Sequence, residues 1–184
     1  YGGSVENRAR FGCEVIRAVR KKVGPDYPVL MRMSGTSWSE GAISVEDSVI
    51  QAPLFVEAGL DAVDVSCGSL ESYHYILPPY MVPAGFNLDA AAAIKKAVNV
   101  PVIAVGRLGT DFELAEKALE DGKADFIAMG RSLIADPEIP KKLAEGREDD
   151  IVRCISCNKC ISSAVMSKYD GMACTVNPHC MRER

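Results

Sequence analysis

Four cysteines near the C-terminus have the residue type and the spacing of metal ligands. They are Cys154, Cys157, Cys160 and Cys174, with two, two and thirteen residues between them. Such a triplet gathers three thiolates around one small volume, and a returning segment can supply a fourth, as in cubane iron–sulfur clusters. A zinc site is the alternative, in which Cys174 would pair with His179 or Cys180 as the second arm.

A second chemical signal follows two apolar runs, residues 102–105 and 126–129. Both runs are short and unalternating, which is typical of parallel strands buried on both faces, and each ends in Gly-Arg. A glycine lets the backbone approach a ligand closely, and an arginine adds positive charge beside exposed N–H groups. We therefore predict a phosphate site here, with two simple tight turns as the alternative. Its residues would be Gly106, Arg107, Gly130 and Arg131.

Two further side chains are candidates for chemistry. Arg32 lies in the apolar run 29–34, where a charge is costly unless it meets a ligand or pairs with a carboxylate on a neighbouring strand. His74 lies in a long connection, residues 67–86, and is a candidate proton donor, with an ordinary surface histidine as the alternative. Long ordered loops are usually functional, so we expect this connection to cover the substrate.

These residues must be positioned by alternating strands and helices. The strands are expected at residues 29–34, 62–66, 102–105 and 126–129, each followed by a helix. This alternation predicts an α/β fold with a parallel sheet, equivalent to about four of the units of a (β/α)8 TIM barrel. In such barrels the phosphate site lies after the seventh and eighth strands. Asp64, inside the second strand, is expected to be a polar residue of the barrel interior.

Local signals set the expected helix boundaries. Ser4 caps a first helix that ends near Val23, and Ser44 caps the second, in which Pro53 should cause a kink or a split. Thr110 is expected to cap the helix after residues 102–105. The buried face of the first helix is expected to consist of Phe11, Val15, Ala18, Val19 and Val23.

Composition excludes several classes of protein. The net charge of −4 argues against a nucleic-acid surface, and no apolar run approaches the roughly 18 residues of a membrane span. Seven cysteines, an odd number mostly near the C-terminus, do not suit a secreted disulfide framework and favour a reducing cytoplasm. A small-molecule substrate is the expected partner, and the oligomeric state stays open.

The length suggests that the chain is a piece of a longer protein. A closed barrel takes about 250 residues, whereas the 184 residues here start at Tyr1 and contain four repeats. We expect residues 1–150 to be the C-terminal half of a barrel and residues 151–184 to be an irregular cluster-binding segment.

Several motifs together resemble the old yellow enzyme superfamily of NADH:flavin oxidoreductases. They are YGGSVENRARF at residues 1–11, Arg32, the two Gly-Arg ends, Ala135-Asp136-Pro137, and the cysteine run through Cys174-Thr-Val-Asn-Pro178. The closer match is the iron–sulfur branch, which includes 2,4-dienoyl-CoA reductase, the 2-enoate reductases and trimethylamine dehydrogenase.

The resemblance implies roles for the residues above. Arg32 would contact the N1/C2-carbonyl edge of FMN, and the two Gly-Arg ends would hold its phosphate. The four cysteines at 154, 157, 160 and 174 would ligate a 4Fe-4S cluster. Family members continue into a region that binds FAD and NAD(P)H, which this sequence lacks.

The implied activity is reduction of the C=C bond of an α,β-unsaturated carbonyl with electrons from NAD(P)H. The proton donor is usually a tyrosine upstream of Tyr1, and His74 lies in the loop where some relatives place a helper histidine. We therefore expect this piece alone to be inactive. The alternatives are an amine dehydrogenase of the same family, a non-redox barrel enzyme with a phosphorylated substrate and a zinc knuckle, and a metal-binding interaction module.

Overall fold

Four parallel strands form one sheet, in the order β1-β2-β3-β4, in the computed structural model, which describes residues 1–166 and 171–182. The strands are β1 (Leu30–Ser34), β2 (Ala62–Ser66), β3 (Val102–Ala104) and β4 (Phe126–Ile127). Each is followed by a helical segment, and every neighbouring pair is parallel. The predicted α/β class and the predicted strand positions are confirmed, with β1 and β3 each one residue shorter than expected and β4 two residues shorter.

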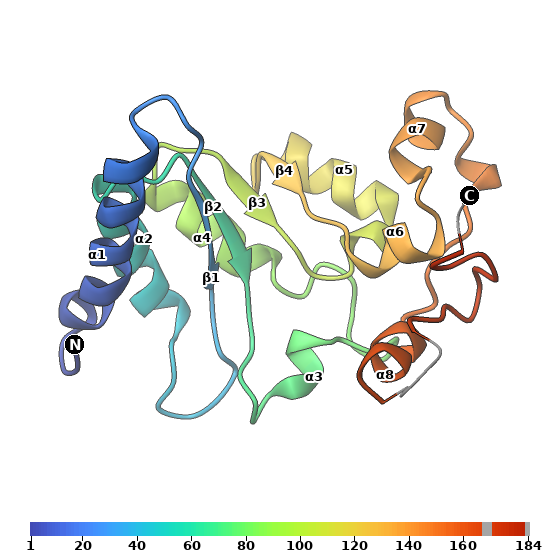
Figure 1. The fold of residues 1–184 in the computed structure, drawn as a ribbon, viewed down its shortest axis with the longest axis horizontal. Helices are drawn as coiled ribbons and strands as arrows, with labels where there is room; N and C mark the ends of the chain where they lie inside the picture. The colour runs from blue at the N-terminus through green and yellow to red at the C-terminus, as the bar shows by residue number, and fades with distance from the viewer. Residues whose placement is uncertain (167–170, 183–184) are drawn as a thin grey trace.

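The helices lie mainly behind and beside the sheet in the view of Figure 1. The longer ones are α1 (Val5–Val23), α2 (Val45–Glu57), α4 (Leu88–Ala97), α5 (Phe112–Glu120) and α8 (Lys159–Met166). Short helices are α3 (Tyr73–Ile76), α6 (Arg131–Ala135) and α7 (Ile139–Ala144), with 3-10 turns η1 (Leu108–Thr110) and η2 (Glu148–Asp150). No helix in the described ranges is long and apolar enough to cross a membrane.

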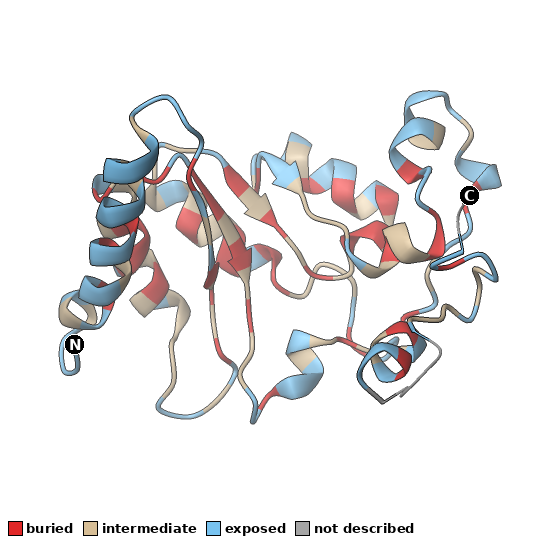
Figure 2. Ribbon diagram, viewed as in Figure 1, coloured by how far each residue is buried: buried red, intermediate tan, exposed pale blue. Residues whose placement is uncertain are grey.

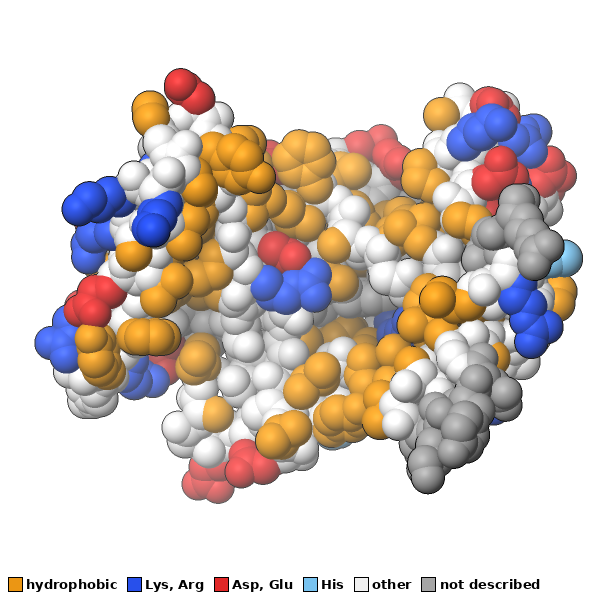
Figure 3. All heavy atoms as spheres, viewed as in Figure 1, with side chains coloured by type: hydrophobic (Ala, Val, Ile, Leu, Met, Phe, Trp, Pro, Cys, Tyr) orange, Lys and Arg blue, Asp and Glu red, His pale blue; other side chains and the backbone are white. Residues whose placement is uncertain are grey.

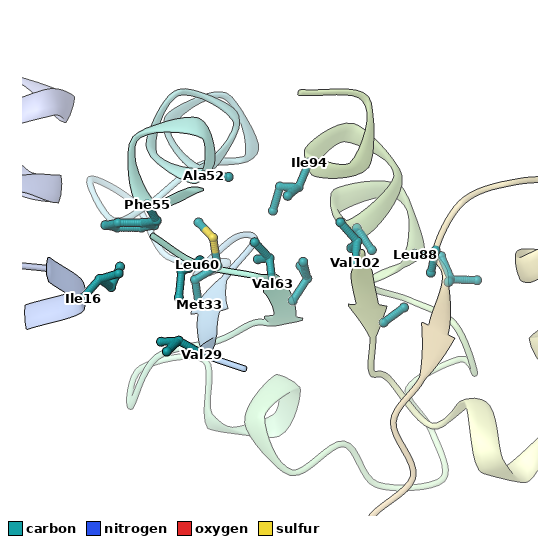
Figure 4. Close-up of a cluster of buried hydrophobic side chains, with 14 of the residues drawn as sticks. Ile16, Val29, Met33, Ala52, Phe55, Leu60, Val63, Leu88, Ile94 and Val102 are labelled. Carbon is teal, nitrogen blue, oxygen red and sulfur yellow. The ribbon is translucent and has the colours of Figure 1, made fainter. Parts of the chain in front are cut away.

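The main core fills the space between one face of the sheet and helices α1, α2 and α4. Val63, Ile94 and Val102 are fully buried there, and Figure 4 shows them in a layer with Met33 and Phe55. Burying an aliphatic side chain of this size contributes about 1.5–3 kcal/mol. This face of the sheet therefore holds the strands in register.

The opposite face of the sheet is much less covered. In register across it lie Arg32, Asp64, Ile103 and Phe126, one from each strand. Phe126 is 57% exposed, and Leu30 on β1 is 52% exposed. Figure 2 shows buried, intermediate and exposed residues along the strands. Figure 3 shows hydrophobic side chains around a cluster of one acidic and one basic patch. In a closed barrel such positions face the interior.

The buried face of α1 differs from the expected one. Ala9, Cys13 and Ile16 are buried, whereas the face that the spacing predicted is exposed. Its members Phe11, Val15, Ala18, Val19 and Val23 all face solvent. Gly12 gives the reason, because a Cβ atom there would lie 2.7 Å from the ring of Phe55. The stripe that contains Gly12 and the smaller side chains lets α1 and α2 pack closely, so this stripe is the buried one.

Two boundary predictions are also corrected. Thr110 ends η1, and it is the Asp111 carboxylate that caps α5, accepting a hydrogen bond from the Leu114 amide at 3.0 Å. Helix α2 runs from Val45 to Glu57, so the predicted split at Pro53 is wrong, and the alternative of a kink stays a prediction. The predicted caps Ser4 and Ser44 are confirmed.

The C-terminal segment is attached to the sheet-bearing part by polar and apolar contacts. Asp136, 4% exposed, accepts hydrogen bonds from the Val152 amide at 2.9 Å and from Lys142 Nζ at 2.6 Å. Ile151 packs in a small buried cluster with Phe112 and Ile139. Residues 151–184 are also less irregular than expected, because they contain α8.

Candidate functional site

A cavity of about 300 Å³ opens at the C-terminal edge of the sheet. Its walls come from the segments that follow β2, β3 and β4 and from the cysteine-containing segment. Six residues predicted from the sequence line it, namely Arg32, Gly106, Arg107, Gly130, Arg131 and Cys154. Figure 3 shows basic side chains at the bottom of a hollow on this face. The fold therefore brings together residues that lie far apart in the sequence, from Arg32 to Cys154.

Backbone geometry explains why glycine is needed after β3. Gly106 has φ +147, a conformation that side chains disfavour, and a Cβ atom there would lie 3.3 Å from the Phe86 ring. The next residue, Arg107, has the left-handed φ of 60. At Gly130 an added Cβ atom would meet nothing within 4 Å. Both glycines line the cavity, and the backbone at Gly130 has open space beside it.

Each of the two arginines is anchored by part of its guanidinium group. Arg107 donates from Nη1 to the Tyr80 carbonyl at 2.9 Å and to the Val82 carbonyl. Arg131 donates from Nη1 to the Pro78 carbonyl at 2.8 Å. Among the described residues, Arg107 Nη2 and Arg131 Nε and Nη2 have no acceptor. Donors therefore remain available to a ligand.

The charges at this site favour an anion. Burial lowers the pKa of the Arg107 guanidinium, and the nearby positive charge of Arg131 lowers it further. Two like charges held side by side in a half-buried site are relieved by a negative group between them. With free donors, open glycine backbone and two cations, the residues present fit a phosphate.

Arg32 forms the ion pair that the sequence offered as one of two outcomes, and its contact with a ligand stays a prediction. It lines the cavity, and it also donates to Asp64 Oδ2 on β2, from Nε at 2.8 Å and from Nη2 at 2.6 Å. Asp64 Oδ1 is buried with no partner in the described part of the chain. The parallel register, which pairs positions 32 and 64, is the signal that identifies this contact.

The four predicted metal-ligating cysteines lie in one region as free thiols. A hydrogen bond with Thr175 lowers the pKa of Cys157, and burial raises that of Cys160, which also feels the charges of Cys154 and Cys174. The Sγ atom of Cys157 lies 3.2 Å from Thr175 Oγ1, next to Cys174 in the chain. As the described side chains are oriented, no three of them form a group that could hold a metal ion. Four thiols at this spacing fit a thiolate-bound cluster in the chemistry of their donor atoms.

His74 is not brought to the cavity. Its side chain is exposed on α3, and its ring lies 4.2 Å from the ring of Tyr75. Tyr75 itself lines the cavity and stacks between Trp38, at 4.8 Å, and Phe86, at 5.6 Å. Sequence reasoning missed this aromatic stack, because its members come from two separate loops.

Cys67 also lines the cavity, directly after β2. Burial raises the pKa of this thiol to about 11, so it stays protonated at neutral pH. A protonated, buried thiol of this kind suits a packing role.

A parallel sheet with a basic cavity at the carboxyl ends of its strands is the arrangement found in phosphate-binding barrel enzymes. The match to a known family is direct: the chain belongs to the NADH:flavin oxidoreductase / NADH oxidase family, whose profile matches residues 1–150.

Three similar proteins illustrate the family. An NADH oxidase from Thermoanaerobacter brockii is 45% identical over the whole chain, and a cinnamate reductase from Clostridium sporogenes is 37% identical over the whole chain. The structure of a 2-naphthoyl-CoA reductase in complex with 2-naphthoyl-CoA superimposes on 98% of the chain with a TM-score of 0.89 and 37% identity.

The chain spans less than a third of each of these proteins. It covers 28% of the NADH oxidase, 30% of the cinnamate reductase and 27% of the naphthoyl-CoA reductase chain. The four-stranded sheet is thus part of the TIM barrel on which the family is built.

Proposed function

We propose that the chain is the second half of the FMN-binding barrel of an NAD(P)H-dependent oxidoreductase, followed by a segment that holds a 4Fe-4S cluster. The observation that carries the proposal is the pair of Gly-Arg strand ends, which place two arginines with unused donors on one cavity. Family membership supports a flavin as the ligand.

In this proposal the phosphate of FMN is held by the backbone of Gly106 and Gly130 and by the free donors of Arg107 and Arg131. In this arrangement the two guanidinium groups neutralise the phosphate and fix its position. FMN supplies hydride transfer when it is bound.

Arg32 is proposed to contact the N1/C2-carbonyl edge of the flavin. Asp64 holds the guanidinium by two hydrogen bonds to one oxygen, so the side chain keeps a single orientation toward the cavity. A fixed positive charge there stabilises negative charge that develops on the ring system.

The cysteines at 154, 157, 160 and 174 are the proposed ligands of the cluster. Their free thiols and the position of Cys154 in the cavity wall support this assignment. FAD and NAD(P)H are expected to bind elsewhere in the complete protein. Free cysteines in the described ranges also favour a reducing cytoplasm as the location.

The proposed substrate is a small α,β-unsaturated carbonyl compound, an enoate or enoyl-CoA. Support comes from the similarity to a cinnamate reductase and to a naphthoyl-CoA reductase. The exposed position of His74 does not support a proton-donating role for it, so the acid is expected outside this chain.

The test uses the complete protein, purified without oxygen. NADH oxidation is followed with cinnamate as the unsaturated acid, and dye reduction is followed with dimethylamine as the amine. Saturable reduction of cinnamate supports the proposal. Turnover of dimethylamine alone would assign the amine dehydrogenase alternative, and zinc without flavin would assign the non-redox one.

A further inference from the structure

Two of the four residues that lie between the cysteines of the triplet contact the two arginines of the anion site. We call residues 154–160 the Cys loop. Arg107 donates from Nε to Ser156 Oγ at 3.1 Å, and Arg131 donates from Nη1 to Asn158 Oδ1. These contacts join positions 49 and 27 residues apart in the chain. The Cys loop is therefore part of the wall that supports the arginines.

The backbone of the Cys loop is shaped to present these side chains. Ser156 and Asn158 have left-handed φ values of 52 and 59, which are uncommon for residues other than glycine. Ser156 is 1% exposed, and its hydroxyl lies against Arg107 rather than in solvent. Such conformations persist where the surrounding contacts hold them, and they concentrate at functional sites.

Asn158 has a second contact, which links it to the connection that follows β2, residues 67–86. Its Nδ2 donates to the Leu77 carbonyl at 2.9 Å, while Arg131 donates to the neighbouring Pro78 carbonyl at 2.8 Å. The amide thus bridges the loop after β2 and the arginine. Arg131 Nη1 donates to the Pro78 carbonyl and to Asn158 Oδ1, whereas Nε and Nη2 have no acceptor among the described residues.

We propose that Ser156 and Asn158 are positioning residues for the flavin phosphate: they hold Arg107 and Arg131 in the orientation that binds it. This inference rests on the proposed function, because it takes FMN as the ligand. An arginine side chain has high rotamer entropy, and a site in which its orientation is already fixed loses less on binding. The affinity for FMN then depends on the Cys loop, although neither residue touches the phosphate.

The test measures FMN and riboflavin binding to the complete protein after its flavin has been removed. Riboflavin lacks the phosphate, so the ratio of the two dissociation constants reports on the phosphate site alone. The variants are Ser156→Ala and Asn158→Gly, of which the second keeps a left-handed backbone accessible. The controls are Ser162→Ala, an exposed serine on α8, and Asn99→Gly, an exposed asparagine after α4.

Each test variant is expected to weaken FMN binding about tenfold, the usual size for a lost hydrogen bond to a charged group. Riboflavin binding should change by less than about twofold, and the controls should match the parent protein for both ligands. Equal weakening of FMN and riboflavin, or no weakening of either, would overturn the inference. A parent protein that binds riboflavin as tightly as FMN would instead overturn the proposed phosphate site.

A charge-changing variant gives an independent check. Asn158→Asp places a carboxylate against Arg131, where it competes with the phosphate for the guanidinium. FMN binding should fall further than in Asn158→Gly, and the difference should shrink at high salt because charges interact less strongly there. An aspartate variant that binds FMN as tightly as the parent protein would contradict the positioning role.

Discussion

Replacing Asp136 with asparagine should loosen the attachment of the C-terminal segment. The Asp136 carboxylate accepts three hydrogen bonds: from Lys142 Nζ at 2.6 Å, from the Val152 amide at 2.9 Å and from the Glu138 amide at 3.0 Å. The side chains of Asp136 and Lys142 are 5% and 13% exposed. The variant leaves a nearly buried ammonium group without its carboxylate.

The magnitude follows from these contacts. Removing one partner of a buried ion pair costs about 3–5 kcal/mol. Lys142 also donates to the Asp150 carbonyl at 3.0 Å, and asparagine can still accept one hydrogen bond, so both effects reduce the loss. We expect about 2 kcal/mol, which corresponds to roughly 30-fold faster exchange of a protected amide hydrogen.

The loss of stability in Asp136→Asn should depend on pH with a definite sign. Burial acts to raise the pKa of Asp136, but the hydrogen bonds from Lys142, Val152 and Glu138 outweigh it and lower the pKa. A carboxyl group with a lowered folded-state pKa adds stability above its unfolded pKa of about 3.9, and this stability disappears as the pH falls through the folded value. The difference between parent and variant should therefore be full at pH 7 and shrink below about pH 4.

The assay is hydrogen exchange at the Val152 amide in the complete protein, with Asp121→Asn as the control. Asp121 pairs with Lys117 at 3.7 Å on the surface, with side chains 44% and 67% exposed, so its loss should change stability by less than about 0.5 kcal/mol. Exchange at Val152 that is equally slow in the parent protein and in Asp136→Asn would refute the reasoning.

Three further predictions concern the site. Arg131→Ala should weaken FMN binding about tenfold or more. The control Arg147→Ala, which breaks only surface ion pairs, should leave FMN binding unchanged. Full flavin occupancy in Arg131→Ala would count against a phosphate contact. Cys157→Ala should lose iron in elemental analysis while Cys13→Ala retains it, and equal iron in both would reject the ligand assignment. Gly106→Ala should lower both thermal stability and FMN retention. The reason is that φ +147 disfavours a side chain and that the added Cβ atom would lie 3.3 Å from the Phe86 ring. An unchanged melting temperature and flavin content would contradict this.

Local patterns were enough to predict most of the framework. The runs at 62–66 and 102–105 are apolar, short and bounded by turn residues, so their identity as strands depends on few distant contacts. Each Gly-Arg pair comes shortly after a predicted strand in the sequence. Because the strands are parallel, the sheet brings both pairs to its C-terminal edge. The clustering of the predicted residues around one cavity follows from this topology.

Features that depend on tertiary packing could not be predicted in the same way. Helix α1 carries two apolar stripes, and the close contact of Gly12 with Phe55, a tertiary contact, favours burial of the one with smaller residues. Thr110 and Asp111 are both good capping residues, and the extra turn of η1 moves the cap to the second. The contacts of the arginines with Ser156 and Asn158 join distant segments, so no local pattern indicates them.

The most direct test of the account is the flavin and metal content of the complete protein after purification without oxygen. We predict one FMN, released as the phosphate-bearing flavin, and about four irons per chain, with the yellow-brown absorbance of both groups. A colourless protein without iron, or one that contains zinc in place of iron, would contradict the account.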